Sequence, residues 1–320
     1  MEEQDKKQVV KTRSAAACIR EGFGIIANHP AAMLSGTWPW IVLISLAILL
    51  YLAGCVSLVN HIMAGGQPGP WMLAKVALGL LLVVACSYFL EARVMLIMRH
   101  LRDNGTMVRI GPFRQLKPTL QIALNMLPFV VVLLVLSALL GTLWGLVLHW
   151  ASSQQSFTLM VTIAVAAMAA ALLAVVFLLP LIQTFYAYSM DGGNFFKTLR
   201  STYSKGLRHV GKLLAVNLLS VILVELLMLV VSLPLVVLAV ASLLSGMGVW
   251  VMGDASGMPS YMGWLWGATS VVCISLASYC YLALLSSNLF AYGAIEAAEV
   301  ERMKYKPLET ARSQELSNMS

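Results

Sequence analysis

The strongest constraint on this chain is a long stretch without charge, since no Asp, Glu, Lys or Arg occurs between Pro118 and Asp191. An α-helix rises about 1.5 Å per residue, so about 20 apolar residues cross the ~30 Å hydrocarbon core of a membrane. The stretch is long enough for two crossings, and the polar run from His149 to Ser156 predicts the turn between them. Hydrophobic residues make up 60% of the chain and charged residues 11%, a balance that a soluble domain could not hide from water.

The same argument along the chain predicts an all-α polytopic membrane bundle. Backbone amides in lipid must be bonded within a helix or a closed barrel, and barrel strands would alternate polar and apolar residues. The runs in this chain are apolar on every side, which favours helices. Six transmembrane helices, paired as three hairpins, are expected at Trp38 to Ile62, Trp71 to Leu90, Thr119 to Leu148, Phe157 to Ala187, Leu213 to Ser242 and Tyr261 to Tyr292.

Basic residues are distributed unevenly between the two sides of these predicted spans. Of the 21 Lys and Arg residues, only Lys75 falls on the side of the three hairpin turns. Because cytoplasmic loops carry the excess of Lys and Arg, both chain ends are expected in the cytoplasm. The predicted organisation is a cytoplasmic tail over residues 1–37, a six-span domain over 38–292, and a cytoplasmic segment over 293–320. That last segment is expected to be helical until Lys306-Pro307 and disordered beyond it.

Basic amphipathic helices are predicted at the cytoplasmic surface before the hairpins. The clearest covers Asn194 to Lys212, with Asn194 as its N-cap, and a shorter one covers Ser14 to Asn28. The basic residues of the first helix, which we expect to contact anionic lipid headgroups, are Lys197, Arg200, Lys205, Arg208 and Lys212. The alternative is that these charges only set the topology. The excess of Lys and Arg on the cytoplasmic side explains the net charge of +7 without a nucleic-acid partner.

Glu225 is the acidic residue that lies well inside a predicted span. An ionisable group at that depth is costly, so it is a candidate for proton coupling or cation binding. The other interpretation is a protonated carboxyl that bonds a neighbouring helix. The polar side chains in the spans that we consider as its partners are Asn217, Gln183, Asn125 and Ser220.

Motifs for catalysis, cofactors or metals are absent from the sequence. It contains no Gly-rich phosphate loop, no zinc-protease motif and no nucleophile elbow. The five cysteines show no Cys-x-x-Cys spacing, and His61 and His149 have no carboxylate or cysteine companion, so neither a zinc site nor another metal site is predicted. The glycine pairs Gly141 with Gly145 and Gly263 with Gly267 are expected to allow close helix packing. Packing within the bundle is the favoured interpretation, and packing between two copies of the chain is the alternative.

One segment carries a family resemblance. The run from Asp191 to Ser201, followed by Tyr203, Gly206 and a predicted span, resembles an element of bacterial six-span families. These families include the membrane domain attached to glycerophosphodiester phosphodiesterases and its stand-alone relatives. The resemblance implies a stand-alone bundle in the bacterial inner membrane. The phosphodiesterase catalytic domain has no counterpart in this chain, so its activity and metal ligands are not carried over.

The sequence therefore favours a non-enzymatic integral inner-membrane protein. Its expected partners are the lipid bilayer and anionic lipid headgroups, with a membrane-protein partner or a second copy of the chain also considered. The alternative function is a small-solute transporter or channel. Such a protein would use Glu225 and the helices interrupted by Pro128, Pro180 and Pro234.

The topology can be tested by cysteine accessibility. A cysteine at Lys205 should react with a membrane-impermeant maleimide only after the cytoplasmic side is opened, because the segment that contains it carries five basic residues. A cysteine at His149 should react in intact cells. Labelling of both positions from the same side would rule out this arrangement of the spans.

Overall fold

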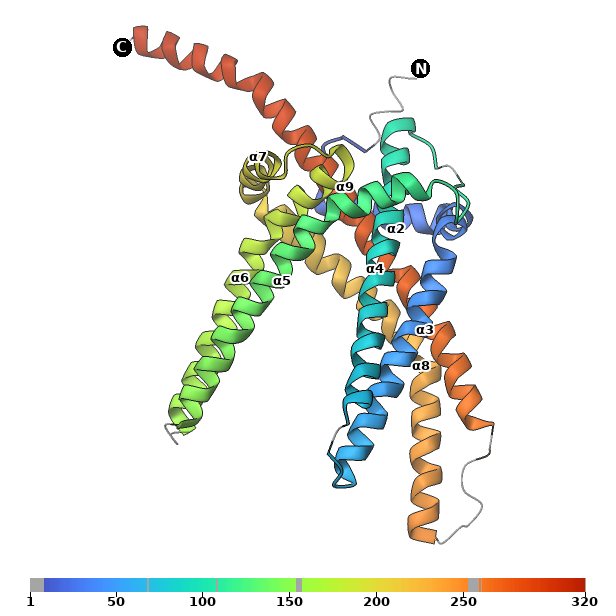
Figure 1. The fold of residues 1–320 in the computed structure, drawn as a ribbon. Helices are drawn as coiled ribbons and strands as arrows, with labels where there is room; N and C mark the ends of the chain where they lie inside the picture. Colours follow the sequence, from blue (N-terminus) through green and yellow to red (C-terminus); the bar gives the residue numbers. More distant parts are fainter. Residues whose placement is uncertain are drawn as a thin grey trace.

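The computed structural model describes residues 9–67, 69–107, 109–153, 157–252, 259 and 261–319. It is 89% helical, and the described residues contain no strand. Figure 1 shows long helices that extend from one end of the molecule, where the two short helices also lie. In chain order the helices are α2 (Ala15–Asn28), α3 (Pro30–Met63), α4 (Pro70–Asn104), α5 (Leu116–Ser153), α6 (Phe157–Asp191), α7 (Phe195–Arg208), α8 (Val210–Met252) and α9 (Met262–Met319).

The long helices confirm an all-α membrane bundle. Within the described residues, five helices are long and apolar enough to cross a membrane, namely α3, α4, α5, α8 and α9. The fourth predicted span lies in α6, a helix of 35 residues. Its described residues include the shorter apolar segment Val161–Ala170. The short helices α2 and α7 and the far end of α9 lie at the same end of the bundle, which we call the α7 end (Figure 1).

Helix α7 begins at its predicted cap, Asn194, and α2 is capped by Ser14, the first residue of its predicted range. The Ser14 hydroxyl accepts a hydrogen bond from the backbone N–H of Ala17 at 3.3 Å, and the Asn194 carbonyl oxygen accepts one from Lys197 N–H at 3.4 Å. The expected helix from Asn194 to Lys212 is nevertheless two helices. The chain turns at His209, so Lys212 belongs to α8. The turn redirects the chain from α7 into the apolar helix α8.

Helix α2 packs against α9 as part of the core. Its residues Ile19 and Ile26 are buried, and a Cβ atom placed on Gly22 would lie 2.6 Å from Ser287 Cα. Such close approach of two backbones is available only to glycine. The apolar face that the sequence placed at the membrane surface is therefore occupied by another helix.

Two expectations about helix ends and helix contacts are wrong. The helix predicted to stop at Lys306-Pro307 continues in α9 to Met319. The spacings Gly141 to Gly145 and Gly263 to Gly267 make no close contacts, since nothing lies within 4 Å of a Cβ placed at any of the four. The pairing of α3 with α4 uses Gly79 instead, where such an atom would lie 2.8 Å from Tyr51 Cα.

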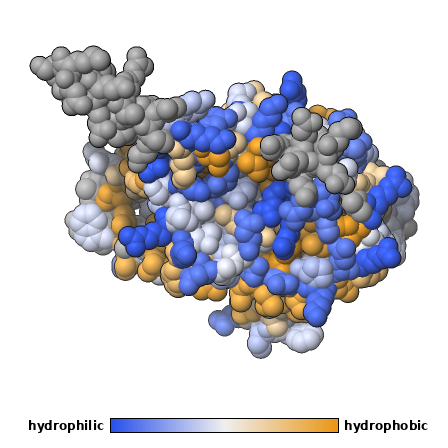
Figure 2. All heavy atoms as spheres, turned by 90° about the horizontal axis from the view of Figure 1, so that it is seen from above, coloured by the Kyte–Doolittle hydropathy of each residue, from blue (hydrophilic) through white to orange (hydrophobic). Residues whose placement is uncertain are grey.

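Polar side chains are concentrated at the α7 end. Seen from above, this end presents hydrophilic side chains with hydrophobic ones between them (Figure 2). At the opposite end the hairpin of α5 and α6 extends away from the other helices (Figure 1), and no described residue between Val131 and Leu178 is buried. Contacts that hold the hairpin to the bundle therefore come from the half nearer the α7 end.

Arg93 is the largest fully buried side chain among the described residues. Its guanidinium donates to the carbonyl oxygens of Gly36 at 3.3 Å and Arg114 at 2.8 Å, and also to that of Gly111. It donates in addition to the Thr119 hydroxyl at 2.9 Å. One side chain on α4 thus joins α3, the linker after α4 and the first turn of α5. A rigid planar group with five N–H donors is suited to this role.

Replacement of Arg93 by Met should destabilise the fold by about 3 kcal/mol, because the buried carbonyls would lose their donors. The midpoint of thermal unfolding in detergent measures the effect. Arg99→Met is the matched control, since Arg99 is half-exposed and faces Asp103 at 3.8 Å. This control should change stability by no more than about 0.5 kcal/mol. Equal shifts for both variants would contradict the structural role of Arg93.

Candidate functional site

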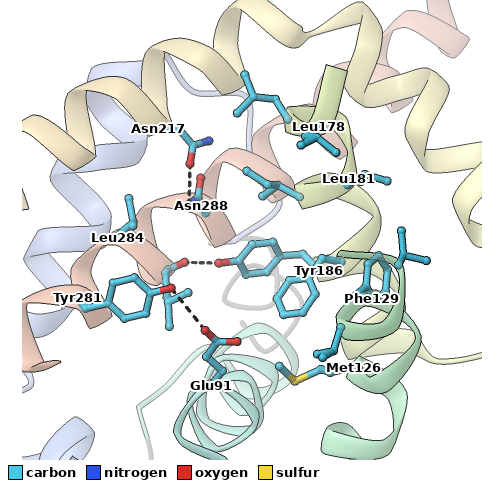
Figure 3. A pocket seen from close by; sticks show the side chains of 16 residues that line it. Glu91, Met126, Phe129, Leu178, Leu181, Tyr186, Asn217, Tyr281, Leu284 and Asn288 are labelled. Carbon is cyan, nitrogen blue, oxygen red and sulfur yellow. Dashed lines mark hydrogen bonds between the residues drawn. The ribbon is translucent and has the colours of Figure 1, made fainter. Parts of the chain in front are cut away.

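A cavity of about 460 Å³ lies near the α7 end, enclosed by α4, α5, α6, α8 and α9 (Figure 3). Its volume falls in the range of small-molecule sites, about 300–1,000 Å³. Most of its wall is apolar. The residues that line it are Glu91, Met126, Phe129, Val130, Val132, Leu178, Leu179, Leu181, Ile182, Phe185, Tyr186, Asn217, Tyr281, Leu284, Leu285 and Asn288.

Three hydrogen bonds organise the polar part of this wall (Figure 3). The Tyr281 hydroxyl donates to Glu91 Oε1 at 3.4 Å, which connects α9 to α4. The Tyr186 hydroxyl donates to the carbonyl oxygen of Leu285 at 2.7 Å. The Asn288 amide donates to Asn217 Oδ1 at 3.2 Å, which connects α9 to α8. Each of these bonds joins two helices, so the polar groups also hold the cavity wall together.

Two polar groups on the cavity wall have unused acceptor capacity. Asn288 is only 6% exposed, and its Oδ1 atom has no hydrogen-bond partner. Glu91 forms no ion pair with any described residue, and Tyr281 is the hydrogen-bond donor to its carboxylate. A buried acceptor without a donor is costly, so a bound molecule with donor groups would be stabilised here.

The five polar residues that the sequence singled out in the spans are not brought together. Asn217 lines the cavity, whereas Gln183 is buried and donates to the carbonyl oxygen of Tyr292 at 3.4 Å. Asn125 lies beside Gly192, with its amide nitrogen 3.6 Å from a Cβ placed there. Glu225 is exposed on α8 and makes no hydrogen bond or ion pair to a described residue. Ser220 is buried, and its hydroxyl has no hydrogen-bond partner among the described residues. None of the predicted partners therefore bonds Glu225 in the described part of the chain.

Glu91, Tyr281 and Asn288 belong to the cavity but were not predicted. Glu91 directly follows the predicted end of the second span at Leu90, so it was counted with the polar loop. Asn288 lies in the sixth predicted span after Ser286 and Ser287, and this polar run was visible in the sequence. The hydrogen bond between Asn288 and Asn217 cannot be predicted from the sequence, because it depends on how α8 and α9 pack.

The basic residues of α7 fall into two groups. Lys205 contacts both carboxylate oxygens of Glu296, at 3.1 and 2.9 Å. Arg208 reaches the carboxylate of Glu299 at 3.4 Å, and His209 reaches it at 3.2 Å. Two of the five predicted lipid-contacting residues thus pair with α9 instead. Of the others, Lys197 and Arg200 are exposed on α7 and Lys212 is half-buried on α8.

Helix α7 packs on α6 through small residues. The Thr202 hydroxyl donates to that of Thr184 at 2.9 Å, and a Cβ placed on Gly206 would lie 3.0 Å from Pro180 Cα. Two apolar side chains of α7 lie outside this contact, since Phe196 is 76% exposed and Leu207 is 44% exposed. Helix α7 therefore presents apolar and basic side chains together, outside its contacts with α6 and α9.

The long apolar helices and the polar α7 end define an integral membrane protein with several spans. Comparisons with models of known protein families, with curated proteins and with solved structures found no match. The resemblance to the phosphodiesterase-associated membrane domain therefore remains a prediction. Among the described residues, no group of three or more His, Cys, Asp or Glu side chains is arranged to hold a metal ion.

The ion pair between Lys205 and Glu296 should hold α7 against α9. Lys205→Glu places two carboxylates together, so amide hydrogen exchange in α7 should become faster, and adding Glu296→Lys should restore protection. Lys197→Glu, on the exposed side of the same helix, serves as the control and should leave exchange unchanged. Equal loss of protection in the control would show that helix charge, rather than this pair, controls docking.

Proposed function

We propose that this chain is a non-enzymatic integral membrane protein of the inner membrane that binds anionic lipid headgroups through α7. The observation that carries the proposal is the pair of surfaces that α7 leaves uncovered. Phe196 and Leu207 are exposed and apolar, and Lys197 and Arg200 are exposed and basic. A helix of this kind lies in the membrane interface, with its apolar side chains among the acyl chains and its basic ones among the phosphates.

The charges available for lipid binding are fewer than the sequence indicates. Lys205 and Arg208 are already paired with Glu296 and Glu299, whose side chains are 22% and 4% exposed. Lys197 and Arg200 remain, each contributing about 1 kcal/mol near an anionic surface. Because α7 is also packed on α6 and joined to α9, lipid bound there would act on the ends of two spans at once.

A second copy of the chain or another membrane protein is a further partner that we propose. The open positions at Gly141, Gly145, Gly263 and Gly267 support it, because a small residue with nothing in front of it lets another helix approach closely. The alternative of a small-solute transporter that uses Glu225 gains no support from the position of that side chain, which is exposed and does not line the cavity.

Binding of phosphatidylglycerol and phosphatidylcholine to the full-length protein, measured by native mass spectrometry in mixed micelles, tests the lipid proposal. The wild type should prefer phosphatidylglycerol. Lys197→Gln with Arg200→Gln should weaken that preference by about 30-fold, since two contacts of about 1 kcal/mol each are lost.

The control variant removes two exposed basic charges elsewhere, through Arg20→Gln with Lys304→Gln. It should keep the preference of the wild type. If the control variant loses the preference for phosphatidylglycerol to the same extent as the α7 variant, the effect comes from net charge. The proposed role of α7 would then be wrong.

A further inference from the structure

Glu91, the acid in the cavity, has no cationic partner among the described residues. Arg93 follows Glu91 by two residues on α4, yet its guanidinium is engaged by three backbone carbonyls and the Thr119 hydroxyl. The Tyr281 hydroxyl bonds one carboxylate oxygen of Glu91 and leaves the other without a described partner. A positive charge from outside the chain would stabilise a carboxylate in so apolar a wall.

The second unused group points to the same kind of ligand. The Oδ1 atom of Asn288 is a buried acceptor, and the partner amide of Asn217 donates to the carbonyl oxygen of Leu213 at 2.9 Å. Both unused groups of the cavity therefore accept hydrogen bonds. A ligand that places N–H donors here satisfies them, whereas a carboxylate or phosphate group at this same position would add a third acceptor and repel Glu91.

Aromatic rings surround this acidic part of the cavity. Tyr186 and Tyr281 lie near Glu91, and Phe129 lies on the side of α5 (Figure 3). Phe185 of α6 also lines the cavity. The rings of Phe129 and Phe185 meet edge to face, with their centroids 5.5 Å apart. Ring faces attract an ammonium group more strongly once water is excluded. The remaining wall is aliphatic and suits an apolar body.

We propose that the cavity binds an amphiphilic cation, with an ammonium group between Glu91, Tyr281 and Asn288 and its apolar body among the residues of α5 and α6. The cavity offers a contact to each part of such a molecule, with unused acceptors for the charge and apolar side chains for the body. The site is separate from the exposed face of α7, so it goes beyond the proposed lipid contact and does not depend on it.

Equilibrium binding of radiolabelled dodecylamine to the full-length protein in maltoside micelles tests this proposal. The amine is protonated at pH 7, since alkylamines of this type have a pKa near ~10.4. We expect one saturable site, and dodecanol, which lacks the charge, should compete at least about tenfold more weakly. Equal competition by dodecanol would overturn recognition of the cation.

Glu91→Gln should weaken dodecylamine binding about tenfold, because the amide keeps an acceptor for Tyr281 but loses the charge. Glu225→Gln removes an acidic group outside the cavity and should bind as the wild type does. Val130→Trp fills the cavity and should abolish binding, which keeps the test decisive if Glu91→Gln does not fold. If the Val130 variant binds dodecylamine as the wild type does, the proposal that the cavity is the binding site is wrong.

The source of the ammonium group is resolved by adding lipids to the same assay. Displacement of dodecylamine by phosphatidylethanolamine, but not by phosphatidylglycerol, would identify a membrane lipid as the ligand. If neither lipid displaces it, the ligand class is a free amphiphilic amine. Displacement by phosphatidylglycerol alone would contradict a site for cations.

Discussion

The guanidinium of Arg93 is the interaction on which the arrangement at the α7 end depends. It is buried and has no acidic partner among the described residues, and it donates to carbonyl oxygens of α3 and of the linker after α4 and to the Thr119 hydroxyl of α5. A linker between two membrane helices has backbone groups that no helix satisfies, and lipid offers them no hydrogen bonds. Arg93 supplies those bonds and so sets where α5 begins relative to α3 and α4. The cavity walls formed by α4 and α5 therefore depend on the position that Arg93 gives to the start of α5.

Polar contacts between helices are clustered at this same end. Glu296 and Glu299 of α9 hold α7 and the turn at His209, and the contacts of Asn217 with Asn288 and of Tyr281 with Glu91 lie a little deeper. The distal parts of the helices, where lipid surrounds apolar side chains, have few such contacts. Most polar contacts between helices thus lie at the end of the bundle where water and headgroups are near. The exposed face of α7 and the cavity both belong to this part of the protein.

Much of the fold was predictable because its causes are local. Runs of apolar residues, the caps at Ser14 and Asn194, and the bias of basic residues each act over a few turns of chain. The candidate sites were less predictable. Glu225 is predicted as a candidate because it is alone in an apolar run, yet the structure leaves it outside the cavity. Glu91 lines the cavity, but its position next to a predicted loop does not indicate this. Sequence position reports depth in the membrane but not the direction of a side chain.

By itself the sequence determined that the chain is helical, that it crosses a membrane several times, and where most helices begin. Lipid cannot bond backbone groups or solvate charge, so composition alone decides these features. Only the tertiary structure decided that α2 joins the core, that Lys205 and Arg208 pair with α9 rather than remaining available to lipid, and that Glu91 and Asn288 face one cavity. These outcomes depend on the packing of helices distant in sequence, because apolar helices look alike to lipid and are distinguished by the few small and polar residues where they meet.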